Sequence, residues 1–120
     1  MIDKFEAIDE IRKLIYSYCW MVDRADYEGL AEFFEHTTIY YDGVVANPEG
    51  PDGKATAAPF KDAVIRYEDG LPHTSHCCIN PIIEVDVENG TAEAKHYTIV
   101  IQGKTGEFGP EVKIQVYKYD

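Results

Sequence analysis

The spacing of apolar residues changes once along this chain, near Pro72, and that change limits the fold more than any other feature. Before Pro72 the apolar residues recur every three or four positions, which is typical of helices. After Pro72 they alternate, as Val112, Ile114 and Val116 do, which is typical of strands. Helices followed by antiparallel strands predict an α+β domain in which the helices cover one face of a sheet.

Three helices are expected before Pro72. A long one over residues 3–22 begins at a capping box formed by Asp3 and Glu6. Asp26 can cap a second helix, and a third is expected near residues 60–67, terminated by Gly70. A strand over 37–41 and a loop over 42–58 separate the last two. The apolar residues that define the three helices are Phe5, Ile8, Ile11, Ile15, Cys19 and Val22, then Leu30, Phe33 and Phe34, then Phe60, Ala63, Val64 and Tyr67.

Three strands are expected after Pro72, over residues 74–87, 91–102 and 111–119, with a turn-rich loop over 103–110. Pro81 cannot donate to a ladder, so a bulge or bend is expected there. Asn89-Gly90 favours a two-residue hairpin turn, which would pair Ile83 with His96. His76 would then lie about 23 Å from His96 along the sheet, and the bulge leaves open which face His76 takes.

Length, charge and cysteine content exclude several classes of protein. The 120 residues are expected to form one domain, residues 1–120. The net charge of −11 repels phosphate backbones and anionic membranes, so neither is an expected partner. The first residues do not resemble a secretory signal, and no apolar run approaches the roughly 20 residues that span a bilayer. Three cysteines cannot all pair within one chain, which indicates reduced thiols and a cytoplasmic protein.

Two stretches, in this order, resemble the SnoaL-like (nuclear transport factor 2-like) superfamily over nearly the whole chain. The first is IRKLIYSYCWMVD at 11–23, continued by RADYEGL at 24–30 and the Phe33-Phe34 pair. The second is PHTSH at 72–76, followed by NPIIEV at 80–85 and TAEA at 91–94. The resemblance implies a cone-shaped bent sheet packed on about three helices and enclosing a pocket for a small molecule. The motifs are nearest to those of scytalone dehydratase-like and bile-acid dehydratase-like members.

The resemblance also implies an activity. In such members an Asp after the first helix pairs with a His on the sheet, and Asp23 and His76 occupy those positions here. The expected function is a cofactor-independent lyase or isomerase. In this reaction His76 would transfer a proton, and Asp23 would orient the His76 ring. Tyr18 or Tyr41 would polarise a small apolar carbonyl or alcohol substrate. The residues expected to line the pocket are Tyr16, Trp20, Phe60, Cys78 and Gln102.

Some residues depart from this pattern or allow other interpretations. Gln102 or a neighbour stands where scytalone dehydratase has a second histidine. Members usually continue past Asp120 into another strand, so either this chain is truncated or a partner subunit supplies the edge; a homodimer is expected. His73 and His76 are expected to point to opposite faces, no metal site is predicted, and His96 is interpreted as structural. The alternative function is a non-catalytic domain of the same fold for ligand binding or dimerisation.

Overall fold

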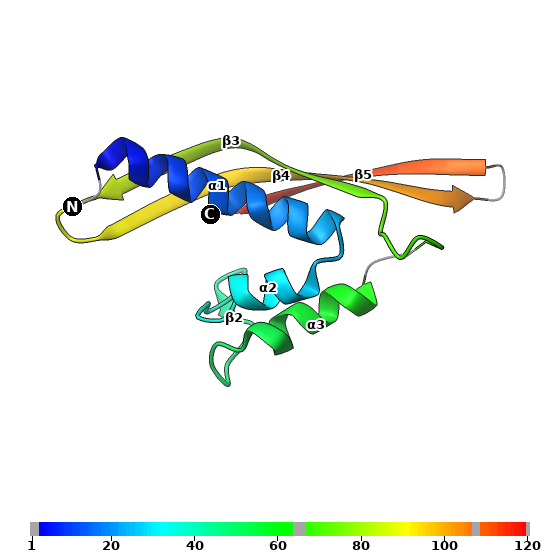
Figure 1. Ribbon diagram of the computed structural model, residues 1–120, viewed down its shortest axis with the longest axis horizontal. Helices are drawn as coiled ribbons and strands as arrows, with labels where there is room; N and C mark the ends of the chain where they lie inside the picture. Colours follow the sequence, from blue (N-terminus) through cyan, green and yellow to red (C-terminus); the bar gives the residue numbers. More distant parts are fainter. Residues whose placement is uncertain (1–2, 64–66, 107–108, 120) are drawn as a thin grey trace. The chain divides into compact units, whose positions relative to one another are not determined.

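The computed structural model describes residues 3–63, 67–106 and 109–119 and has an α+β fold (Figure 1), as the sequence predicts. The chain forms two compact units, one of Met1–Trp20 with His73–Asp120 and one of Met21–Pro72. The helices are α1 (Lys4–Asp23), α2 (Tyr27–Phe33) and α3 (Gly53–Ala63). The strands are β1 (Tyr40–Tyr41), β2 (Val44–Val45), β3 (Thr74–Asp86), β4 (Thr91–Gly106) and β5 (Gly109–Tyr119).

Helix α1 has the amphipathic pattern that the sequence predicts. Its first turn is capped by Asp3, whose Oδ1 accepts a hydrogen bond of 2.7 Å from the backbone N–H of Phe5. Cys19 and Val22, on the apolar stripe, are buried near its C-terminal end. Phe5 was expected on the same stripe but is 79% exposed, so the stripe is covered only from Ile8 onward.

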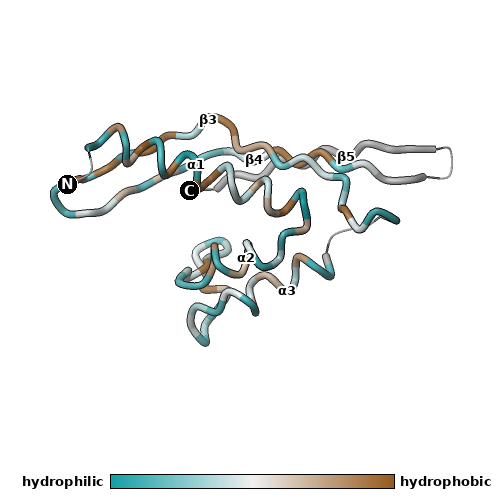
Figure 2. Tube along the Cα trace, viewed as in Figure 1, coloured by the Kyte–Doolittle hydropathy of each residue, from teal (hydrophilic) through white to brown (hydrophobic). Residues whose placement is uncertain are grey.

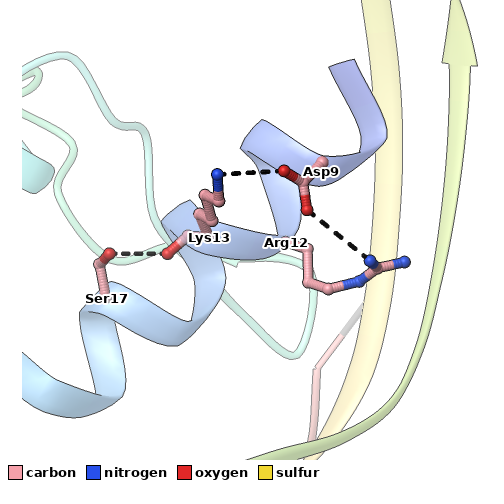
Figure 3. A network of polar contacts seen from close by, with 4 residues as sticks. All are labelled: Asp9, Arg12, Lys13 and Ser17. Atoms are coloured by element: carbon pink, nitrogen blue, oxygen red, sulfur yellow. Dashed lines mark hydrogen bonds and ion pairs between the residues drawn. The ribbon is translucent and has the colours of Figure 1, made fainter. Parts of the chain in front are cut away.

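The exposed face of α1 carries a short network of polar side chains (Figure 3). Asp9 lies 3.1 Å from Lys13 Nζ and 3.9 Å from Arg12 Nη1. Ser17 donates a hydrogen bond of 2.6 Å to the Lys13 carbonyl one turn earlier. These contacts at i+3 and i+4 spacing support the helix weakly, because the ion pairs are exposed to water.

The larger sheet is antiparallel in the order β3-β4-β5. Strands β3 and β4 are hydrophobic in their middle portions, and the turn between them is hydrophilic (Figure 2). That turn differs from the prediction, because Asp86 pairs with Thr91 and four residues connect the strands instead of two. Asp86 explains the difference: its carboxylate accepts from the Asn89 backbone N–H at 3.1 Å and from Asn89 Nδ2 at 2.7 Å. The expected pairing of Ile83 with His96 is therefore wrong, and Ile83 pairs with Ala94.

The predicted irregularity at Pro81 is confirmed. The pairing of β3 with β4 shifts between Ile79 and Ile82, and Asn80 has a φ of 52°. One extra residue on β3 reverses which of its residues face each side. Before the bulge, the even-numbered residues of β3 share a face with the even-numbered residues of β4. After the bulge, the odd-numbered residues of β3 share that face with the even-numbered residues of β4.

The second and third strands of this sheet are longer than expected. β4 continues to Gly106 and β5 begins at Gly109, where a loop over 103–110 was predicted. Thr105 pairs with Pro110 and Gly106 with Gly109, so the ladder extends almost to the connection. Gly and Pro residues suggested a loop here, but backbone pairing with a neighbouring strand overrides the weak preference of these residues.

The second unit contains α2, α3 and the small β1–β2 sheet. Asp26 caps α2 as predicted, accepting a hydrogen bond of 2.9 Å from the Gly29 N–H. The third helix lies earlier than predicted, because Asp52 caps it by accepting from the Ala55 N–H at 3.0 Å. Pro59 lies within this helix. Val64 falls outside the described residues, and Tyr67 and Gly70 belong to a turn in which the Gly70 N–H donates to the Tyr67 carbonyl.

The strand expected over 37–41 is reduced to Tyr40–Tyr41, which pairs with Val44–Val45 inside the predicted loop. Asn47 replaces the missing strand contacts. Its side chain accepts from the Ile39 N–H and donates to the Thr37 carbonyl, both at 2.8 Å. A side chain thus satisfies backbone groups that a longer ladder would otherwise have paired.

Replacing Gly53 by alanine is expected to destabilise the protein by about 1–3 kcal/mol. A Cβ at this position would overlap the Ala31 carbonyl oxygen of α2 and lie 3.2 Å from the Glu35 Cα, so backbone would have to move. Urea denaturation of Gly53→Ala measures the loss, with Lys54→Ala at the exposed next position as the matched control. Equal stabilities of the two variants would contradict this close approach of α3 to α2.

The Asp86 turn predicts a dependence of stability on pH. The side-chain hydrogen bond from Asn89, together with its backbone N–H, lowers the pKa of Asp86 below its ordinary value of 3.8. The ionised carboxylate therefore stabilises the fold above pH 3.8, and this contribution is lost as the pH falls through the lower folded pKa. At pH 7 the wild type is expected to have a higher free energy of unfolding than Asp86→Ala. This difference is expected to shrink below pH 3.8. Glu84→Ala, which removes an exposed carboxylate from the same strand, should not show this pattern.

Candidate functional site

The side chains of chemical interest in the first unit lie on the face of the sheet that α1 covers. His76 and Cys78 are alternate residues of β3, and they pair with Val100 and Thr98 of β4. The Tyr18 ring meets the His76 ring edge-on, with centroids 6.5 Å apart and an interplanar angle of 82°. This contact decides the question that the bulge left open, because it places the half-buried His76 on the α1 side.

A chain of sulfur and hydroxyl groups continues along the same face. Cys19 Sγ of α1 lies 3.2 Å from Cys78 Sγ, which lies 3.7 Å from Thr98 Oγ1. Thr98 is only 2% exposed, and its hydroxyl lies 3.3 Å from His96 Nδ1. That ring nitrogen also lies 3.2 Å from the Tyr97 carbonyl, so the tautomer of His96 determines which contact is a hydrogen bond.

The observed register brings His96 closer to His76 than predicted. His76 pairs with Val100, which is four residues from His96 on β4, or about 13 Å at 3.3 Å per residue. The predicted separation of about 23 Å is therefore wrong, because the four-residue turn and the extra residue at the bulge together shift the pairing by three residues. Through Thr98, His96 contributes to the polar chain that includes Cys78.

Asp23 belongs to the second unit, where the end of α1 determines its position. The Asp26 N–H donates to the Met21 carbonyl at 2.9 Å and the Ala25 N–H to the Val22 carbonyl at 3.1 Å. These two bonds form a Schellman motif in which Ala25, with a φ of 56°, takes the left-handed position that usually holds glycine. Asp23 is thus the last helical residue, where the helix dipole disfavours a carboxylate. Its pairing with His76 stays a prediction.

The remaining predicted pocket residues are divided between the two units. In the first unit Tyr16 and Trp20 are exposed on α1, and Gln102 pairs with Thr74 at the start of β3. In the second unit Tyr41 is 69% exposed, and Phe60 stacks on Phe34 with centroids 6.2 Å apart. Within the first unit, therefore, the structure brings Tyr18, His76 and Cys78 to one face.

Sequence reasoning missed Cys19 and Thr98 as members of this cluster. Cys19 was assigned only to the apolar stripe of the first helix. Thr98 could have been found from the pairing with Cys78, but the wrong hairpin turn displaced the register. No sequence signal reports the sulfur contact itself, because it depends on how α1 packs on β3.

A comparison with known protein families matches the SnoaL-like domain over residues 3–119. The chain belongs to the SnoaL-like domain family. This family includes polyketide cyclases, isomerases and dehydratases, and its fold binds small molecules. Comparisons with curated proteins and with solved structures found no match. The likeness to the superfamily is thus confirmed, whereas the nearer likeness to dehydratases stays a prediction.

Two hollows of this SnoaL-like domain are lined by described residues outside the predicted site. One of about 490 Å³ lies in the second unit, where Glu32, Glu35 and His36 face the start of α3. Another of about 240 Å³ lies beside the β3–β4 hairpin. In residues 3–63, 67–106 and 109–119, no three His, Cys, Asp or Glu side chains gather as metal ligands do. Within those ranges, the helices are too short or too polar to cross a bilayer.

Proposed function

We propose that this SnoaL-like domain is a cofactor-independent lyase or isomerase, of the dehydratase type, that acts on a small apolar carbonyl or alcohol compound. The contact between Tyr18 and His76 on the α1 side of the sheet carries this proposal. This contact brings together His76, which can take and return a proton, and Tyr18, which can donate a hydrogen bond. Family membership makes a small-molecule reaction the natural use of this pair.

Each residue has a separate role in the proposed reaction. His76 removes a proton from the carbon beside a carbonyl group, and the Tyr18 hydroxyl donates a hydrogen bond to the oxygen on which negative charge develops. The protonated His76 then returns the proton to the departing hydroxyl group, which leaves as water. The family resemblance alone gives Asp23 the proposed role of orienting the imidazole and stabilising its protonated form, and it gives Tyr41 the role of alternative donor to the oxyanion.

The surroundings of the pair support this chemistry. Val100, which pairs with His76, is buried, as are Cys19 and Thr98 on the same face. Apolar neighbours lower the local dielectric constant, so that a hydrogen bond to a developing charge is stronger than it is in water. The overall charge of −11 disfavours anionic substrates, so the proposed substrate is uncharged.

A panel of uncharged hydroxy-carbonyl and unsaturated carbonyl compounds tests the proposal. The purified full chain is incubated with each compound, and mass spectrometry follows the loss of water or, for an isomer, a change in chromatographic mobility. Conversion of at least one compound well above the rate in buffer is expected. A compound that raises the melting temperature but is never converted would instead support a non-catalytic ligand-binding domain.

The proposal also includes a homodimer in the cytoplasm. The sheet face opposite α1 exposes the large apolar side chains of Ile82, Tyr97 and Ile101, which a second copy could cover. The three cysteines are not joined in disulfide bonds, as in proteins of a reducing compartment. Light scattering of wild type and Tyr97→Lys tests the dimer: the wild type should have twice the monomer mass and the variant should dissociate. A monomeric wild type would contradict it.

A further inference from the structure

Two thiols from distant parts of the chain face each other in the first unit. Cys19 on α1 and Cys78 on β3 are 59 residues apart in sequence, and their Sγ atoms lie 3.2 Å apart. A disulfide bond is about 2.05 Å long, so the two sulfur atoms need to approach by only about 1 Å.

The two thiols differ in accessibility, which assigns them different roles. Cys78 is half-buried and accessible in part to a dissolved oxidant, whereas Cys19 is 6% exposed. Cys78 Sγ also lies 3.7 Å from the Thr98 hydroxyl, which in turn contacts His96 Nδ1 at 3.3 Å. When Nδ1 is the unprotonated ring nitrogen, this chain provides a path for the proton that the Cys78 thiol must lose to become nucleophilic.

We infer that Cys19 and Cys78 form a reversible intramolecular disulfide when the protein meets a peroxide. The Cys78 thiolate attacks one peroxide oxygen, the O–O bond breaks, and the released hydroxide takes up a proton to leave as water. Cys78 is then a sulfenic acid. Cys19 attacks its sulfur, the S–S bond forms, the S–O bond breaks, and the hydroxyl leaves with the Cys19 proton as a second water molecule. Two thiols are thus oxidised and one hydrogen peroxide is reduced to two water molecules.

Cys77 is excluded from this bond by its position on the strand. It is the neighbour of Cys78 and points to the opposite face, where its Sγ lies 3.6 Å from Ser75 Oγ. Adjacent residues also place their Cα atoms about 3.8 Å apart, closer than the usual range of a disulfide. Cys77 therefore serves as an internal control, because it remains a thiol when the other two cysteines are oxidised.

The bond would tether α1 to β3 next to the proposed catalytic pair. Cys19 follows Tyr18 directly, and Cys78 lies two residues beyond His76 on the same face. The inference does not depend on the proposed reaction, because it requires only the positions of the two sulfur atoms. Closing a loop of this length is expected to raise the melting temperature by roughly 5–10 °C.

Thiol mapping of the full chain tests the inference. Reduced protein is treated with hydrogen peroxide, quenched with N-ethylmaleimide, and analysed by intact mass and by peptide mapping. The number of alkylated cysteines is expected to fall from three to one, with Cys77 alkylated and the peptides of Cys19 and Cys78 cross-linked. Dithiothreitol should restore three alkylated thiols and the lower melting temperature.

Single variants separate this bond from other oxidation products. Cys77→Ser should still form the bond, whereas Cys19→Ser and Cys78→Ser should not show the higher melting temperature after peroxide treatment. Circular dichroism of each reduced variant checks its folding, and Cys19→Ala and Cys78→Ala replace any serine variant that fails to fold. Three alkylated thiols in treated wild type, a cross-link that includes Cys77, or only cross-links between chains would overturn the inference.

Discussion

Replacing His76 by alanine is expected to lower turnover of a converted compound by about 10²–10⁴-fold, the usual contribution of a general acid–base residue. The melting temperature should change little, because His76 is only half-buried. Turnover is measured by mass spectrometry with the best substrate of the panel, and the melting temperature by circular dichroism. His76→Gln should be equally inactive, since its amide cannot accept and return a proton.

His73 offers a matched control for this experiment. It lies three residues before His76, is exposed, and has its carbonyl bonded to the Gly103 N–H at 3.1 Å. His73→Gln should therefore keep turnover. Tyr18→Phe should also lose turnover, because it removes the hydroxyl that donates to the developing oxyanion. It keeps the aromatic ring and therefore the edge contact with His76. An active His76→Gln protein, or a His76→Ala protein that does not fold, would show that the histidine has a structural role.

Replacing Leu30 by alanine is expected to reduce the free energy of unfolding by about 2–5 kcal/mol. Leu30 is 0% exposed on α2, and removing its branched side chain leaves a cavity that the surrounding atoms fill only partly. A loss of this size is a large fraction of the stability of a small domain. Urea denaturation followed by circular dichroism measures the difference from wild type.

Leu14→Ala is the matched control, because it makes the same chemical change at a position on α1 that is 55% exposed. Its effect is expected to stay within about 0.5 kcal/mol. Similar losses for the two variants would contradict the assignment of Leu30 to the core. A loss in Leu30→Ala with an unchanged denaturant slope would indicate a change in stability alone.

Local signals predicted several elements correctly. The repeat of apolar residues and the Asp3 and Asp26 caps predicted α1 and α2, because these interactions join residues less than two turns apart. Pro81 predicted the bulge for a similarly local reason, since proline has no N–H to donate to a ladder. The same signals, with their order along the chain, were sufficient to recognise the SnoaL-like family.

Competing local signals led to the incorrect predictions. Asn89-Gly90 favours a two-residue turn, but Asp86 captures Asn89 and lengthens the turn to four residues. Glycine and proline near Gly53 favour a loop, but the Asp52 cap allows a helix to begin there. In each case a carboxylate that bonds to backbone three residues later outweighed a statistical preference for glycine or proline.

The sequence by itself determined the α+β class, the family, the cap of each of the first two helices and the types of residue available for chemistry. Only the tertiary structure decided that His76 faces α1, that Tyr18 meets its ring, and that Cys19 and Cys78 lie in contact. The physical reason is the separation in sequence of the residues that interact. Caps and periodicities depend on neighbouring residues. The face on which a strand residue lies changes with each bulge or extra turn residue, and a helix–sheet contact depends on the packing of segments about 60 residues apart.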